Sequence, residues 1–131
     1  DMVRKWKEEF SYVNGDDREQ MVELSVEGKK QVVDIGDLIK SVCSMVVGKV
    51  GGAIKAIVAS ADPEYQPILR NNIILSGGGS LIEGIADAIA NDIADIGDVT
   101  VTCVDDPIEK VATGAMALAQ DMPDEQYTAI N

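Results

Sequence analysis

The chain has 131 residues, 46% of them hydrophobic and only 4% aromatic, with 11 Lys and Arg against 23 Asp and Glu and a formal net charge of −12. This length and apolar content allow one domain with an aliphatic core and exclude a disordered chain. The negative charge argues against nucleic-acid backbones and anionic membrane surfaces as main partners. Because the chain contains no histidine, Ser–His and Cys–His catalysis and His-ligated zinc are excluded within it.

The two cysteines indicate a reducing compartment. Cys43 lies on a segment expected to be a buried helix face, and Cys103 lies on a segment expected to be a buried strand. Their separation matches no metal or redox motif, so we expect free thiols and a cytoplasmic location. No signal-peptide pattern is visible, and Asp1 in place of Met suggests a processed or excised piece.

The first half of the chain predicts a helix, a β-hairpin and a long helix. Apolar residues three or four apart predict a helix over residues 2–13, which the polar segment 14–17 ends. Residues 20–35 alternate apolar and polar side chains around a Glu–Gly turn, which is typical of a hairpin. A long apolar stripe then predicts a helix from about residue 36 to about residue 61.

The long helix is apolar enough to raise the question of a membrane span. Lys49 and Lys55 interrupt it, each at a cost of roughly 2.5–3.5 kcal/mol at a bilayer centre. We therefore expect no transmembrane segment, but a soluble helix that is buried on two sides. The cluster of Gly48, Gly51 and Gly52 would let a neighbouring element approach closely, at a cost of about 1 kcal/mol per Gly relative to Ala.

The second half predicts helix–strand–helix–strand–helix, an α/β arrangement. Asp62 is expected to cap a short helix, with Pro63 in its first turn. The later expected elements are strands at 73–76 and 99–104 and helices at 80–94 and 107–121. Strands joined by a helix run parallel with a right-handed crossover, and ligands bind at the carboxyl ends of such strands.

Residues 72–84, Asn-Ile-Ile-Leu-Ser-Gly-Gly-Gly-Ser-Leu-Ile-Glu-Gly, combine a short apolar run with three consecutive glycines, Gly77, Gly78 and Gly79. Ser80 can cap the helix that follows. A strand, a glycine turn and a helix N-terminus form a seat for an anion or nucleotide, because backbone N–H groups and the positive end of the helix point at the turn. A glycine triplet alone also fits a plain βα turn, so this segment leaves both interpretations open.

Three segments together resemble the actin family, in the expected order. Residues 72–87 are similar to the family's adenosine motif. Residues 5–13, Lys-Trp-Lys-Glu-Glu-Phe-Ser-Tyr-Val, resemble the helix whose Lys–Glu pair faces the adenosine, and residues 101–107 with 111–115 resemble the last strand and C-terminal helix. The resemblance runs from about residue 3 to 127. It implies an α/β fold, the C-terminal part of the actin/Hsp70-like ATPase fold, with a βαβα layer and a small outer subdomain of strands and helix.

The resemblance also implies a set of residues that bind ATP or ADP. These are Lys7, Glu8, Gly77, Gly78, Gly79, Leu81 and Ile82. The Lys–Glu pair would contact the adenosine, with Glu8 accepting a hydrogen bond from a ribose hydroxyl. Gly78 and Gly79 would allow close approach of ribose and α-phosphate, and Leu81 and Ile82 would flank the base. Without the resemblance, the Lys–Glu pair would be interpreted as a solvated helix face.

The chain also departs from the family pattern. The two earlier glycine-rich hairpins that hold phosphates and Mg²⁺ in the family are missing, and residues 33–37 resemble one of them only superficially, without its Gly-Thr-Thr continuation. We therefore expect no catalytic residue, no metal ligand and no ATP hydrolysis by this chain alone. The implied division is an outer subdomain at about 16–50, an inner subdomain at 1–15 and 51–106, and a C-terminal helix and tail at 107–131.

Three functions remain open at this point. The first is part of an ATP-binding cytoskeletal filament protein, nearest to the MamK-like branch that positions magnetosomes, with an MreB-like cell-shape protein as the alternative. It implies self-association into filaments, magnetosome-associated partners, and no nucleic acid. The second is a superfamily enzyme such as a sugar kinase or an Hsp70-like ATPase. The third is an interaction domain that has lost nucleotide binding.

Overall fold

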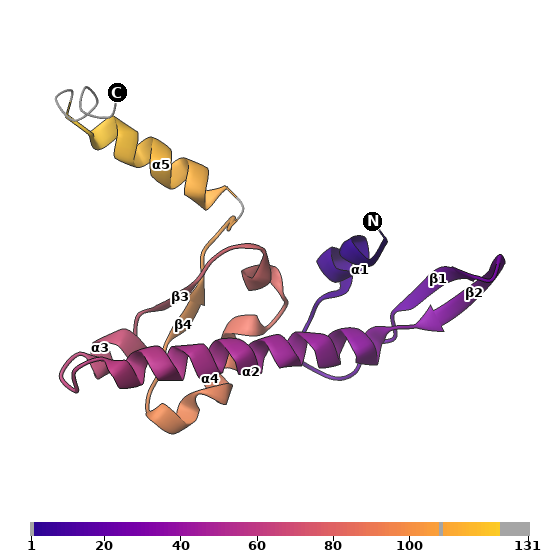
Figure 1. The fold of residues 1–131 in the computed structure, drawn as a ribbon, viewed down its shortest axis with the longest axis horizontal. Coiled ribbons are helices and arrows are strands. Elements are labelled where there is room, and N and C mark those ends of the chain that lie inside the picture. The colour runs from indigo at the N-terminus through magenta and orange to yellow at the C-terminus, as the bar shows by residue number, and fades with distance from the viewer. Residues whose placement is uncertain (1, 108, 124–131) are drawn as a thin grey trace.

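The computed structural model describes residues 2–107 and 109–123, arranged along one long helix (Figure 1). In chain order the elements are α1 (Met2–Phe10), β1 (Met21–Val26), β2 (Lys29–Asp34), α2 (Gly36–Ser60), α3 (Gln66–Arg70), β3 (Ile73–Leu75), the 3₁₀ helix η1 (Gly78–Leu81), α4 (Ile85–Asp92), the 3₁₀ helix η2 (Ala94–Ile96), β4 (Val101–Cys103) and α5 (Lys110–Asp121). The β1–β2 hairpin projects from the N-terminal end of α2, and the elements from α3 to β4 lie along the rest of α2.

The predicted hairpin is confirmed. β1 and β2 pair antiparallel, with Met21 opposite Asp34 and Val26 opposite Lys29. Glu27 and Gly28 have φ of 52° and 77°, the two left-handed positions that a two-residue hairpin turn of this twist requires. All of β2 is exposed, whereas Val22 of β1 is buried at 6% exposure.

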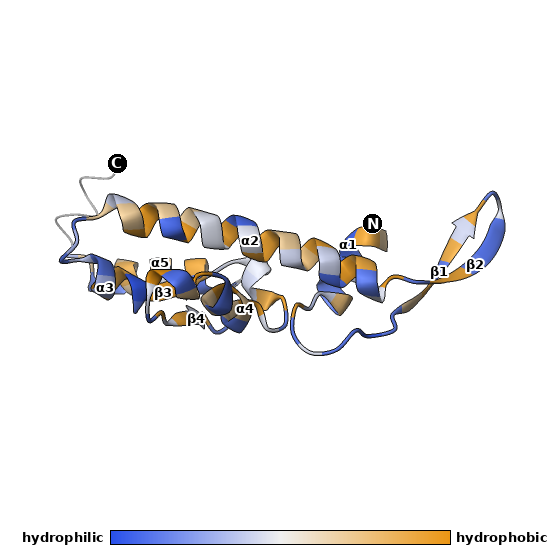
Figure 2. Ribbon diagram, turned by 90° about the horizontal axis from the view of Figure 1, so that it is seen from below, coloured by the Kyte–Doolittle hydropathy of each residue, from blue (hydrophilic) through white to orange (hydrophobic). Residues whose placement is uncertain are grey.

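The predicted long helix is also confirmed, but its two-sided burial is wrong. Cys43, Val47 and Val58 are buried on one side of α2, whereas Leu38 and Met45 remain 64% and 61% exposed. Figure 2 shows hydrophobic stretches along the whole of α2, which lies beside a layer formed by α3, β3, β4 and α4. Apolar side chains therefore lie on more sides of α2 than the described residues cover.

By length and composition alone, α2 could cross a membrane. Core helices of soluble proteins meet the same two conditions. One side of α2 packs on α4, and Lys55 of α2 pairs with Asp95 through a 2.7 Å contact of Nζ with Oδ1. The absence of a transmembrane segment stays a prediction.

The glycines of α2 differ from one another. A Cβ at Gly51 would lie 2.2 Å from Asp92 Oδ2 and 3.1 Å from Ile93 Cγ2, so Gly51 allows α4 to approach α2 closely. A Cβ at Gly48 or Gly52 would have nothing within 4 Å. The close approach predicted for the cluster is therefore confirmed at Gly51 alone.

The core joins α2 to α4. Val47 of α2 packs with Ile85, Ile89 and Ile93, and Ile93 is 0% exposed. The neighbouring strands β3 and β4 pair parallel, as predicted. Cys103 at the end of β4 is exposed, so its expected burial is wrong, whereas Cys43 is buried as expected. β4 is also shorter than the predicted 99–104.

Several helix starts and ends differ from the predictions. α1 ends at Phe10, because Tyr12 pairs with Glu83 in a parallel β-bridge. α3 begins at Gln66, since the residues after Asp62 form a turn in which the Tyr65 N–H donates to the Asp62 carbonyl. Asp62 is therefore not its cap, and the proline in the first turn of α3 is not Pro63 but Pro67.

The C-terminal helix begins later than predicted. α5 starts at Lys110 rather than 107, and none of its residues is buried. It extends away from the other elements (Figure 1). Residue 108 and the predicted tail at 124–131 lie outside the described residues.

Candidate functional site

The glycine turn begins where β3 ends. Gly77 has φ 87° and ψ 177°, a backbone conformation open essentially to glycine alone. The Ser80 N–H and Oγ both donate to the Gly77 carbonyl, at 3.0 and 2.8 Å, which closes the turn into η1. The strand and turn are as predicted, but Ser80 does not cap an α-helix.

The α-helix expected from residue 80 begins instead at Ile85. Its N-cap is Gly84, with φ 80° and no capping side chain. Leu81, which falls within the predicted helix at 80–94, belongs to η1 and is 58% exposed. The positive end of α4 therefore lies beyond the glycines, and the N–H groups nearest to them belong to a single 3₁₀ turn.

Gly78 and Gly79 have free space beside them. Neither has a positive φ, and a Cβ at either would meet nothing within 4 Å. Both residues are exposed. Backbone geometry and packing within the described residues therefore do not explain why glycine stands there, and the backbone of both is accessible to a ligand.

A hollow of about 510 Å³ opens beside this turn, lined by residues 80–87 and 103–107. It contains Leu81 and Ile82, two of the residues that the sequence predicts to flank a base. It lies where β3 and β4 end, the edge at which parallel sheets bind ligands. Asp105 and Asp106 make one wall acidic, which suits a neutral or donor-rich group better than a phosphate.

Lys7 and Glu8 lie on α1 and are exposed. Glu8 Oε1 accepts a hydrogen bond from Arg4 Nε at 2.8 Å, and this bond holds the pKa of Glu8 below its usual value. The second carboxylate oxygen of Glu8 can still accept a hydrogen bond from a ligand. No hydrogen bond between described residues joins the Lys7 or Glu8 side chain to the turn.

The backbone nevertheless joins α1 to the glycine turn. The Val13 N–H donates to the Glu83 carbonyl at 2.9 Å, and the Glu83 N–H donates to the Ser11 carbonyl at 3.2 Å. This parallel bridge places the segment that leaves α1 beside the segment that leaves η1. The structure thus joins the segments that follow the two predicted halves of the site, and the site itself stays a prediction.

An ion pair that the sequence analysis missed reinforces this junction. Arg18 Nη1 and Nη2 donate to Glu83 Oε2 and Oε1, each at 2.7 Å, so the pair is bidentate. The Arg18 guanidinium also lies 4.5 Å from the centre of the Tyr12 ring, and its backbone N–H donates to the Tyr12 hydroxyl at 3.0 Å. Arg18 and Glu83 are 65 residues apart, and no local pattern connects them.

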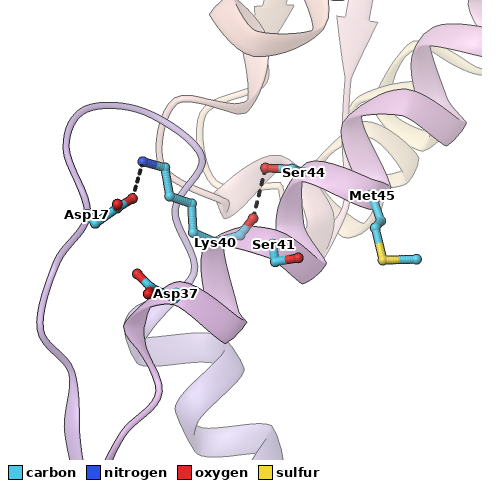
Figure 3. Close-up of a pocket in the computed structure, with 6 residues that line it drawn as sticks. All are labelled: Asp17, Asp37, Lys40, Ser41, Ser44 and Met45. Carbon is cyan, nitrogen blue, oxygen red and sulfur yellow. Dashed lines mark hydrogen bonds and ion pairs between the residues drawn. The ribbon is translucent and has the colours of Figure 1, made fainter.

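A second hollow lies at the start of α2 (Figure 3). Its lining residues are Asp17, Asp37, Lys40, Ser41, Ser44 and Met45. Lys40 Nζ donates to Asp17 Oδ1 at 2.8 Å and to the Gly15 carbonyl at 2.9 Å, and the bond to Asp17 raises the pKa of Lys40. Because its one cation is already paired and two carboxylates flank it, this hollow does not suit an anion.

Comparison with known proteins identifies the family of the chain. The chain matches the model of the MreB/Mbl protein family over residues 3–127. It is similar to the actin-like protein MamK of Paramagnetospirillum magneticum strain AMB-1, with 32% identity over 121 residues, covering 92% of this chain and 35% of the relative. MamK of Magnetospirillum gryphiswaldense is 31% identical over 121 residues, covering 92% and 34%. The chain thus spans about a third of the length of these relatives.

Two solved structures have the same fold as this chain. A non-polymerising MamK mutant bound to AMPPNP matches with a TM-score of 0.81 and 32% identity, covering 92% of this chain and 37% of that one. The MamK double helical filament matches with a TM-score of 0.84 and 32% identity, covering 93% and 38%. The chain belongs to the MreB/Mbl family and forms about a third of an actin-like ATPase fold.

Proposed function

We propose that this chain is part of an ATP-binding, actin-like filament protein of the MamK type and supplies the adenosine side of its nucleotide site. The observation that carries the proposal is the backbone bridge between Tyr12 and Glu83, which joins the segment after α1 to the segment after the glycine turn. A solved relative with this fold is bound to AMPPNP, an ATP analogue, which supports the same ligand here.

The residues proposed to bind nucleotide have chemistry that suits an adenosine. Glu8 would accept from a ribose hydroxyl through its free carboxylate oxygen. Gly78 and Gly79 would let ribose and α-phosphate approach, since open space lies beside both. Leu81 and Ile82 line a hollow in which they would flank the base.

The phosphates and Mg²⁺ would be held by the rest of the protein. Within residues 2–107 and 109–123, no group of three or more His, Cys, Asp or Glu could hold a metal ion. The donors in the described residues therefore do not fit Mg²⁺. ATP hydrolysis would belong to the whole protein, in which γ-phosphate and metal are positioned by other segments.

We also propose that the whole protein assembles into filaments in the cytoplasm. The solved MamK double helical filament supports self-association. Magnetosome positioning with magnetosome-associated partners follows from the MamK likeness, and the family match keeps an MreB-like cell-shape role as the second candidate. The projecting hairpin supports an outer subdomain at about 16–50, apart from an inner one at 1–15 and 51–106 with the C-terminal segment 107–131.

Nucleotide binding by the full-length protein tests the proposal. Fluorescence titration with an ATP analogue would compare wild type with Glu8→Ala and Gly79→Val, with Glu9→Ala as the control on the same helix. We expect wild type and Glu9→Ala to bind alike, Glu8→Ala to bind more weakly, and Gly79→Val to bind least. No binding by wild type would overturn the function, and wild-type affinity in both site variants would overturn the site.

Filament formation is tested separately by sedimentation and electron microscopy with and without ATP. Filaments that depend on ATP in wild type and are lost in Gly79→Val would support an ATP-gated filament protein. A protein that stays monomeric with ATP would instead favour the enzyme or interaction-domain alternatives.

A further inference from the structure

We infer that Arg18 and Glu83 are positioning residues, whose bidentate pair holds the segment after the adenosine-facing helix α1 against the segment after the glycine turn and so sets nucleotide affinity. The inference rests on the proposed function. Neither side chain is assigned a contact with the nucleotide, and Glu83, which is among the residues that line the hollow, has its carboxylate engaged by Arg18. Both act through the segments that carry the contacting residues.

The pair lies at the junction of these two segments. Glu83 follows Ile82 directly in the chain, and its backbone forms the bridge with Tyr12. Tyr12 in turn follows the end of α1 by two residues. A change in the position of the Glu83 carboxylate therefore acts on the segment that leaves η1, and a change at Arg18 acts on the segment that leaves α1.

Packing alone does not fix α1 in the described chain. None of its residues is buried. The first deeply buried side chain after it is Tyr12, at 1% exposure, and Arg18 covers the ring of Tyr12 while bonding its hydroxyl. α1 also contacts α2, but its link to the glycine turn depends on the backbone bridge and on this Tyr12–Arg18–Glu83 contact.

The loop between α1 and β1 fits against the same spot. A Cβ at Gly84 would lie 2.5 Å from Asn14 Cβ, so the loop rests directly on the start of α4. Arg18 Nη2 also reaches Asn14 Oδ1 at 3.5 Å. Arg18 therefore connects the loop, the buried ring and Glu83 in one contact set.

The expected effect of breaking the pair is on affinity more than on folding. The Arg18 and Glu83 side chains are 39% and 54% exposed, and ion pairs this exposed add little to stability. Ligand affinity is more sensitive, because a small displacement of one contacting segment weakens every bond it makes to the ligand. We expect about a tenfold rise in the Kd for ATP when the pair is broken.

Charge exchange in the full-length protein tests the inference. Arg18→Glu, Glu83→Arg and the double exchange would be compared by titration with a fluorescent ATP analogue, together with the melting temperature of the nucleotide-free protein. Each single variant should raise Kd about tenfold, and the double exchange should recover most of the loss. Recovery would be incomplete, because a glutamate at position 18 cannot stack on Tyr12 as the guanidinium does.

The hairpin supplies a matched control. Lys30 Nζ and Glu23 Oε1 form a more exposed pair at 2.5 Å, with side chains that are 83% and 54% exposed. Lys30→Glu, Glu23→Lys and their double exchange change the same charges away from the proposed site. They should leave the Kd for ATP unchanged.

The outcomes separate the inference from the function it rests on. Wild-type binding with unchanged single variants would overturn the inference alone. A second outcome would also overturn it: weaker ATP binding by the single variants that the double exchange does not recover, with a melting temperature that falls as much in the double exchange as in the single variants. That outcome would show a merely structural role. No ATP binding by wild type would overturn both.

Steady-state ATP hydrolysis adds a readout that instability would not reproduce. A positioning role for adenosine predicts a raised KM with kcat nearly unchanged, since the phosphates are bound elsewhere. A fall in kcat at unchanged KM would overturn the inference.

Discussion

Gly36, the first residue of α2, lies directly against the backbone carbonyl of Arg18. A Cβ at Gly36 would fall 1.7 Å from that oxygen and 2.9 Å from its carbon. Both clashing atoms are backbone, so they cannot turn aside as a side chain could. The contact fixes the start of α2 against the loop that carries Arg18.

Gly36→Ala should therefore destabilise the protein by about 3 kcal/mol, the upper range for overpacking. Urea unfolding of the full-length protein would measure the change. Gly48→Ala is the control, since nothing lies within 4 Å of a Cβ there. It should be neutral or stabilise by up to about 1 kcal/mol through helix propensity. Equal effects of the two substitutions would contradict the close contact.

Ile93→Ala should cost about 2–4 kcal/mol, because the side chain is 0% exposed in the cluster that joins α2 to α4. Ile68→Ala removes the same atoms from a side chain that is 59% exposed on α3. It should cost much less. The midpoint and slope of urea unfolding would be compared for both variants, and a similar loss for both would argue against this core.

Tyr12→Phe should cost about 1 kcal/mol, since it removes the hydroxyl that accepts from the Arg18 N–H and leaves that part-buried donor without its partner. The ring, and with it the cation contact, stays. Thermal unfolding would compare it with Tyr65→Phe, whose side chain is 53% exposed and which should be nearly neutral. An unchanged melting temperature in Tyr12→Phe would count against the hydrogen bond.

The carboxylate of Asp34 should make stability depend on pH in the acid range. The N–H groups of Gly36 and Gln20 donate to Asp34 Oδ1 at 2.9 and 2.8 Å, and these bonds lower the pKa of Asp34. A pKa lowered by folding contributes stability above the unfolded value, and that contribution is lost as pH falls through the folded value. The melting temperature of wild type should therefore approach that of Asp34→Asn as pH falls below about 4. A constant difference between the two proteins over this range would contradict the prediction.

Local patterns in the sequence predicted the elements whose causes are local. Alternation around Glu27 and Gly28 predicted the hairpin, and the apolar stripe predicted α2 with ends within a residue or two. The β-branched runs predicted β3 and β4, and the right-handed connection predicted that they pair parallel. The elements themselves follow from residue propensity and hydrophobic periodicity, and both can be determined from the sequence of one segment alone.

Features that depend on distant segments were not predicted. The start of α4 at Ile85 depends on Glu83 being drawn into a bridge with Tyr12, so the Ser80 cap failed. The two-sided burial expected for α2 failed because the described residues cover only one side of the helix. The Arg18–Glu83 pair could have been found only by a signal linking positions far apart in the chain. The adenosine contacts of Lys7 and Glu8 stay predictions.

The ion pair between Arg18 and Glu83 has a consequence for synthesis of the protein. Arg18 and Glu83 are separated by 65 residues, which a ribosome adds in roughly 3–13 s at 5–20 residues per second. α1 leaves the ribosome before the turn and α4, and the segment after it cannot form the bridge with Glu83 until they follow. A chain stalled between the hairpin and the glycine turn would therefore expose α1 together with the apolar sides of α2. Chaperones would bind this exposed apolar surface, and a chain truncated at the same point would keep it exposed.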